Sequence, residues 1–153
     1  MRRLLTRAFR CESGAEFVEM ALAFPLLLLV VLGILEFGLM FQQYEVLTNA
    51  AREGARVAVL PDYTGPDAQL RAEQYIAASF LATDGNTPTV SVGTATPVAV
   101  GANCMSTITV TVTYPHRYLF LSGIGNYFGA SFGTKTLTAS STMRTELPAG
   151  TCP

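Results

Sequence analysis

The feature that most constrains this chain is an apolar run near its N-terminus, from Phe17 to Phe41. As a helix, a run of this length spans about 37 Å, enough to cross the hydrocarbon core of a bilayer with some tilt. Pro25 lies inside the run, where a membrane helix tolerates proline at the cost of a kink. The run therefore predicts one membrane-spanning helix, over residues 15–41.

The charges on either side of the run predict its orientation. Residues 1–14 form a basic leader with four arginines and one glutamate, a net charge of +3. The remainder carries six basic and ten acidic residues, a net charge of −4. Because basic flanks stay on the cytoplasmic side, we expect a single-pass protein with a cytoplasmic N-terminus and an extracytoplasmic C-terminal domain.

The helix is expected to continue outside the membrane over residues 42–60, until Pro61 ends it. Apolar residues recur there at three- and four-residue steps: Phe37, Phe41, Tyr44, Leu47, Ala51, Ala55 and Ala58. Ala50, Gly54 and Ala58 form a row of small residues that lets another backbone approach closely. This half of the helix is predicted to pack along its length.

Residues 61–153 are predicted to form an α+β domain. A second helix is expected from Pro66 to about Leu81. The period then changes to two, with clear strands at 107–114 and 136–145 and a weaker one at 89–100, broken by Gly93 and Pro97. We expect a short antiparallel sheet laid against the outer half of the first helix.

The connection between the two clear strands, residues 118–132, is more apolar than a loop needs to be. It is rich in glycine and contains Tyr118, Phe120, Tyr127, Phe128 and Phe132. The sequence gives this segment no role.

The three cysteines divide between the two sides of the membrane. Cys11 lies in the leader, whereas Cys104 and Cys152 lie in the extracytoplasmic domain, where oxidation is permitted. A disulfide between these two is expected, worth on the order of 3–4 kcal/mol by loop entropy. The alternative is a pair of free or buried thiols.

Nothing in the sequence predicts catalysis. His116 is the sole histidine, and after Pro115 at a strand end it is expected in a solvated turn. No Cys/His cluster has metal-ligand spacing. Net acidity outside the leader argues against a nucleic-acid partner. We expect a non-enzymatic protein without metal, cofactor or small-molecule substrate.

Three blocks of sequence carry a family resemblance: Gly14–Leu22, Phe24–Leu28 and Leu47–Arg56. In this order and spacing they resemble the TadE-like minor pilins (pseudopilins) of the tight-adherence (Tad/Flp) pilus system, over residues 10–60. The resemblance implies a pilin-like domain on the long helix and cleavage between Gly14 and Ala15 by a prepilin peptidase. Glu16, an extra acidic residue at the second mature position, departs from the family pattern.

Glu19 is a carboxylate at the mouth of the membrane segment, where a charge is costly without a partner or a function. The resemblance implies that Glu19 pairs with the new α-amino group of a neighbouring subunit's Ala15. Its alternative role is that of an interfacial residue which reaches the headgroups.

Three further charged residues have open roles. Glu36, near the outer end of the span, either pairs with another helix or reaches the outer interface. Arg52 and Arg56 lie on one helical face and either take part in helix packing or bond nearby acids such as Glu53 and Glu45.

The chain is accordingly expected to be a minor pilin of the bacterial inner membrane. It would act in the assembly of thin adhesive type IVb pili and in surface attachment, with other pilins and pilus-assembly membrane proteins as partners. The alternative is an uncleaved, signal-anchored module for periplasmic or surface binding. A type II secretion pseudopilin is disfavoured because that family has Phe, not Ala, after the cleaved glycine.

Overall fold

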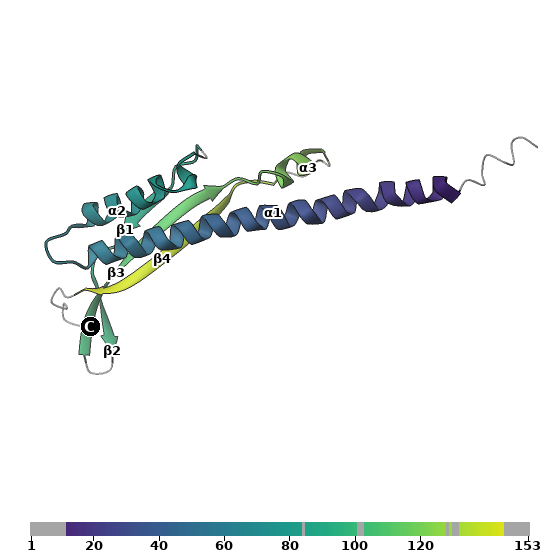
Figure 1. Cartoon of the computed structure of the whole chain (residues 1–153). Coiled ribbons are helices and arrows are strands. Elements are labelled where there is room, and N and C mark those ends of the chain that lie inside the picture. The colour runs from purple at the N-terminus through teal and green to yellow at the C-terminus, as the bar shows by residue number, and fades with distance from the viewer. Residues whose placement is uncertain (1–11, 84, 101–102, 128, 130–131, 146–153) are drawn as a thin grey trace, which may run out of the picture.

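The computed structural model describes residues 12–83, 85–100, 103–127, 129 and 132–145. One long helix extends as an arm from a small α+β domain, which confirms the predicted fold class (Figure 1). The elements are α1 (Glu12–Ala58), α2 (Gly65–Ala77), the short 3-10 helix η1 (Phe80–Thr83), β1 (Thr89–Val92), β2 (Thr96–Val100), β3 (Asn103–His116), α3 (Leu121–Tyr127) and β4 (Lys135–Thr145). Residues 1–11 of the leader, with Cys11, lie outside the described residues.

α1 is a single helix of 47 residues, about 70 Å long. Pro25 lies within it without ending it. Residues 14–35 are exposed except for Leu32 and Gly33, which are half-buried, and the first buried residue is Glu36. Gly14–Ala58 is the one helix among the described residues that is long and apolar enough to cross a membrane.

The outer half of α1 supplies much of the core. Leu47, Ala50, Ala51, Ala55 and Ala58 are buried among side chains of the sheet and of α2. The predicted apolar face was wrong at its N-terminal end, as three aromatic residues are exposed there: Phe37, Phe41 and Tyr44. Two polar residues, Glu36 and Gln43, are buried in their place because the domain offers them hydrogen-bond partners.

α2 packs on α1 through small residues. A Cβ on Gly54 would lie 3.2 Å from the Ala68 carbonyl oxygen, the Ala72 Cβ and a Val110 methyl. The close approach permitted by the row Ala50, Gly54 and Ala58 is thus made within this chain.

The N-terminus of α2 is fixed by a local carboxylate. Asp67 accepts hydrogen bonds from the hydroxyl and the backbone N–H of Thr64, at 2.6 and 2.8 Å. These two bonds, first that of the hydroxyl and then that of the N–H, lower the pKa of Asp67. Pro66 lies in the first turn, where its missing N–H costs nothing.

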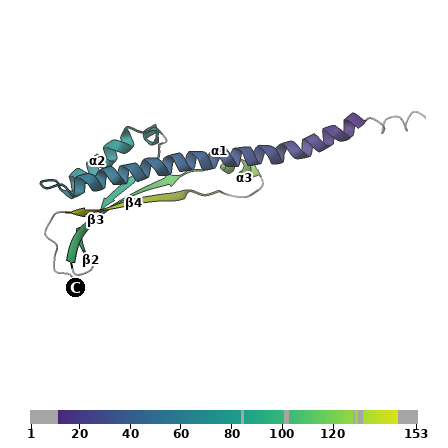
Figure 2. The same cartoon turned by 60° about the horizontal axis from the view of Figure 1, so that its bottom comes forward.

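The sheet is antiparallel and centred on β3. β4 pairs along one edge of β3 from Ser106↔Thr145 to His116↔Lys135, while β1 and β2 share the other edge. α1 and α2 cover one face of this sheet (Figure 2), which buries Ile108, Val110, Val112 and Tyr114 as the alternation predicts. The opposite face is lined with threonine and serine, including a hydrogen bond between the Thr109 and Thr142 hydroxyls at 2.7 Å.

The domain differs from the sequence predictions in two of its elements. The weak strand predicted at 89–100 is two strands, β1 and β2, and residues 93–95 between them are not in a strand. The connection at 118–132 contains the short helix α3, which the sequence did not predict. The side chain of Cys104 and the whole of Cys152 lie outside the described residues, so their pairing stays a prediction.

Candidate functional site

The N-terminal arm, residues 14–35 of α1, carries the predicted cleavage and pairing residues. The domain leaves these residues exposed. Gly14, Ala15 and Glu19 are exposed on α1. A Cβ on Gly14 would meet no described atom within 4 Å. Glu19 follows Ala15 by one helical turn, about 6 Å along the axis. What this arm contacts must therefore lie outside the described part of the chain.

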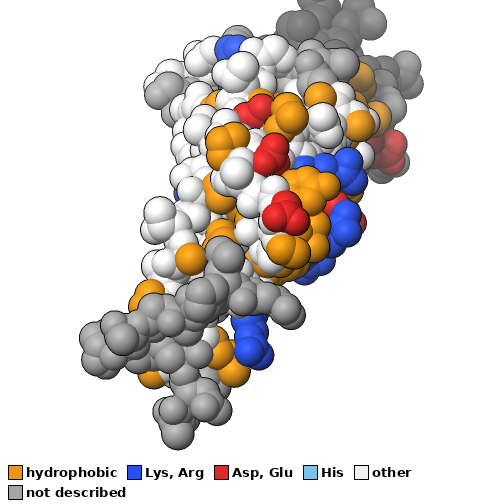
Figure 3. Space-filling view, turned by 90° about the vertical axis from the view of Figure 1, so that its left-hand side faces the viewer, with side chains coloured by type: hydrophobic (Ala, Val, Ile, Leu, Met, Phe, Trp, Pro, Cys, Tyr) orange, Lys and Arg blue, Asp and Glu red, His pale blue; other side chains and the backbone are white. Residues whose placement is uncertain are grey.

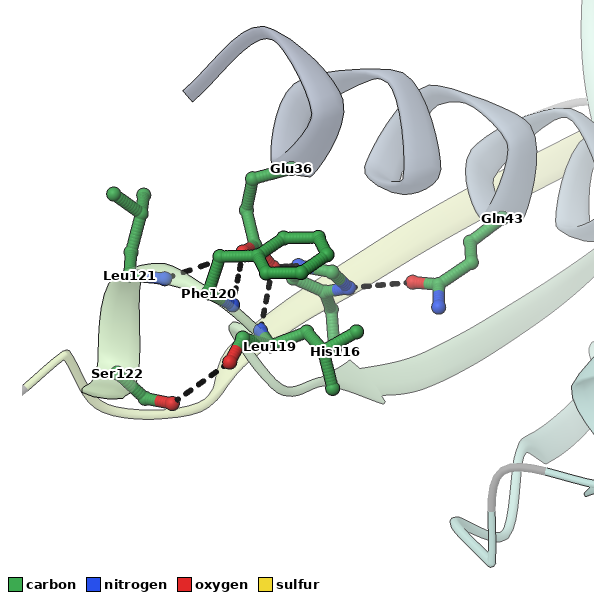
Figure 4. A network of polar contacts seen from close by, with 7 residues as sticks. All are labelled: Glu36, Gln43, His116, Leu119, Phe120, Leu121 and Ser122. Carbon is green, nitrogen blue, oxygen red and sulfur yellow. Dashed lines mark hydrogen bonds and ion pairs between the residues drawn. The ribbon is translucent and has the colours of Figure 1, made fainter. Parts of the chain in front are cut away.

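A second polar site lies where the arm meets the domain (Figure 4). The Glu36 carboxylate accepts backbone N–H groups from Leu119 at 2.6 Å and from Phe120 at 2.7 Å. A third N–H, from Leu121 at the start of α3, lies 3.3 Å from Oε2. Both carboxylate oxygens are thus occupied by the chain's own backbone, and Glu36 is only 1% exposed.

His116 completes this junction. Its Nδ1 lies 2.5 Å from the Gln43 amide oxygen, which is a hydrogen-bond acceptor. Its Nε2 lies 3.7 Å from Glu36 Oε1. The ring also meets the edge of Tyr118 at a centroid distance of 5.1 Å. The residues that join helix to sheet here are thus polar, buried and in mutual contact.

The expectation of a solvated turn at His116 was wrong, because the residue is 2% exposed. β3 continues to its pair His116↔Lys135, so the alternation that buries Val112 and Tyr114 buries His116 as well. Extending the period of two by one step would have found it. Gln43 was also missed, although it lies seven residues after Glu36 and so on the same helical face.

The sequence leaves two roles open for Glu36, pairing with another helix or reaching the outer interface. In the structure its carboxylate contacts the segment that leads into α3. An open hollow of about 510 Å³ borders it, lined in part by Leu39, Arg117 and Ser122.

Arg52 and Arg56 lie farther along α1, where both are exposed. Arg56 pairs with Glu53 at 3.2 Å, and Arg71 of α2 reaches the same carboxylate at 3.5 Å. Such exposed pairs contribute about 0–1 kcal/mol each. They belong to the end of the domain away from the arm, where charged side chains border apolar ones (Figure 3).

The site has no arrangement that suggests metal chemistry. Among the described residues, no group of three or more His, Cys, Asp or Glu side chains is placed to hold a metal ion. The Glu36–His116 pair is instead enclosed by backbone donors and an amide. This arrangement fixes a helix to a sheet.

Comparison with known proteins confirms the resemblance for the N-terminal part of the chain. Residues 14–56 match the family described as TadE-like protein. No curated protein and no solved structure matches the chain. The match covers the exposed arm and the helical half of the Glu36 junction, and it ends before α2 and the sheet.

Proposed function

We propose that this chain is a non-enzymatic minor pilin of a Tad-type system, which acts in the assembly of thin adhesive pili and so in surface attachment. The observation that carries this proposal is the arm of α1, over 20 residues long, that its own domain leaves uncovered. The arm is apolar enough to lie in a bilayer, and its sequence matches the TadE-like family. A helix of this kind has two uses, to anchor the domain and to pack among similar helices.

Cleavage after Gly14 by a prepilin peptidase would leave Ala15 with a positive α-amino group at the cytoplasmic face. Burying that charge among packed helices without a counter-charge costs several kcal/mol. The Glu19 carboxylate, one turn along the arm and exposed, is available as that counter-charge. In this proposal other pilins and pilus-assembly membrane proteins pack on the arm.

The second candidate is an uncleaved, signal-anchored binding module. It shares the membrane helix and the domain, and differs in keeping residues 1–14. The mature mass separates the two, because a minor pilin loses those residues and an anchor does not.

Intact mass spectrometry of the protein from cells with and without the prepilin peptidase provides the test. We expect loss of the first 14 residues only when the peptidase is present, and a full-length mass for Gly14→Val in either strain. A full-length wild-type protein in cells with active peptidase would favour the uncleaved anchor.

A further inference from the structure

We propose that the segment between β3 and β4 rests on the extracytoplasmic surface of the membrane and binds anionic lipid headgroups. We call this segment the foot and define it as the described residues 117–127, 129 and 132–135. The partner is the bilayer in which α1 is anchored. The inference requires α1 to span the membrane, but neither cleavage nor pilus assembly.

The depth of the foot follows from Glu36. If the hydrocarbon core begins at Phe17, its other boundary lies about 30 Å farther along the helix, at Glu36. The carboxylate of Glu36 binds the backbone N–H groups of Leu119 and Phe120 within 2.7 Å. These two residues are therefore held at the depth where α1 leaves the membrane. α3 lies nearer the arm than the rest of the domain in both views (Figures 1 and 2).

The foot exposes apolar side chains at this depth. Leu119 is 66% exposed and Phe132 is 45% exposed, although both belong to a domain with a buried core. The Tyr118 ring, edge-on to Phe132 at 6.0 Å, extends the surface. Leucine and phenylalanine gain from burial in lipid, and a tyrosine at the boundary between lipid and water can keep its hydroxyl hydrated.

The charge of the foot complements an anionic surface. The sequence from Arg117 to Lys135 contains these two basic residues and no acidic one. Both side chains are exposed, and the pairing His116↔Lys135 holds them at the same end of the sheet. Glu36, an acid close to the foot among the described residues, is buried on backbone donors. Basic residues beside a membrane are attracted to anionic lipids.

A second exposed apolar surface gives an internal control. Leu60, Tyr63 and Leu70 are exposed, and they border one hollow near the C-terminal end of α1, away from the arm. Leu60 follows Glu36 by 24 residues, and α1 continues to Ala58, so this surface lies roughly 30 Å beyond the proposed boundary. It cannot touch the bilayer while α1 spans it along the membrane normal.

Single tryptophans provide the test, because the chain contains none. Leu119→Trp, Phe132→Trp and the control Tyr63→Trp replace exposed side chains, so each should fold. The full chain is reconstituted in vesicles of phosphatidylcholine and phosphatidylglycerol that carry a nitroxide-labelled lipid near the headgroup. We expect several-fold stronger quenching for Leu119→Trp and Phe132→Trp than for Tyr63→Trp, with blue-shifted emission.

Two results would overturn the inference. Quenching of the two foot variants no stronger than that of Tyr63→Trp would show that lipid does not contact the foot. Blue-shifted emission without quenching would assign the surface to a contact between copies of the chain instead. Replacing phosphatidylglycerol by phosphatidylcholine should weaken the quenching, and unchanged quenching would remove the anionic lipid from the proposal.

Discussion

Glu36 shows how a single residue in an apolar stretch can determine where a domain begins. A buried carboxylate is tolerated only when its charge is met by hydrogen bonds or an opposite charge. Here the backbone of residues 119–121 supplies those bonds, and His116 lies beside them. The junction between arm and domain therefore depends on the charge of one side chain.

Glu36→Gln should weaken this junction by about 1–3 kcal/mol, because the amide keeps the shape but turns a donor toward backbone donors. Hydrogen exchange followed by mass spectrometry is the direct measurement, since the affected amides are those of residues 119–121. We expect faster exchange there, and no change for Glu45→Gln, an exposed residue of the same helix. Unchanged exchange in Glu36→Gln would show that the carboxylate does not hold the segment.

For single residues, the sequence identified the charged side chains of the site but not the groups that they bind. Glu36 stood out because charges are rare in an apolar run, but its partners come from residues more than 80 positions away. Backbone N–H groups carry no residue signature, so no pattern could have identified them. His116 was within reach, because it continues the alternation of the strand by one step.

At the scale of elements, the packing of α1 on α2 depends on the absence of a side chain at Gly54. The neighbours there are a backbone carbonyl and two side chains of the core, at 3.2 Å from an added Cβ. A long side chain would push α2 away from α1 and open the core cluster.

Gly54→Leu is therefore expected to destabilise the domain by about 1–3 kcal/mol or to prevent its folding. Gly38→Leu is the matched control, because a Cβ there meets nothing within 4 Å on the same helix. Urea unfolding of both variants, followed by circular dichroism in detergent, compares them. Equal stability of the two would mean that α2 does not pack on α1 as described.

Among the elements, strong periodicity was a better guide than composition. The strand at 107–114 and the helix through residue 58 followed from long runs of one period, and tertiary pairing only lengthened the strand. α3 has seven residues, two of them glycine, and such a segment has no helical pattern to detect. The sequence of α3 therefore shows apolar character but no signal for the ends of a helix.

At the scale of the whole molecule, the chain has one part that folds on itself and one that does not. The domain covers α1 from Glu36 onward, while residues 14–35 extend beyond it with apolar side chains exposed. Lipid or other helices must cover those side chains, and the TadE-like match favours a pilus-assembly setting. In the proposed assembly, Glu19 near the end of this arm neutralises the α-amino group of a neighbouring subunit's Ala15.

The most direct test of that claim is the piliation of cells that carry Glu19→Ala or Glu19→Gln. Insertion depends on the apolar run and the basic flank, so both variants should accumulate as normal amounts of processed membrane protein. In the proposed assembly, loss of the carboxylate would leave the amino group of Ala15 buried and unpaired, so we expect few or no surface pili by electron microscopy. Glu73→Gln, an exposed change on α2, should leave pili unchanged. Normal piliation in both Glu19 variants would contradict the proposed pairing with Ala15 and assign Glu19 to the membrane interface.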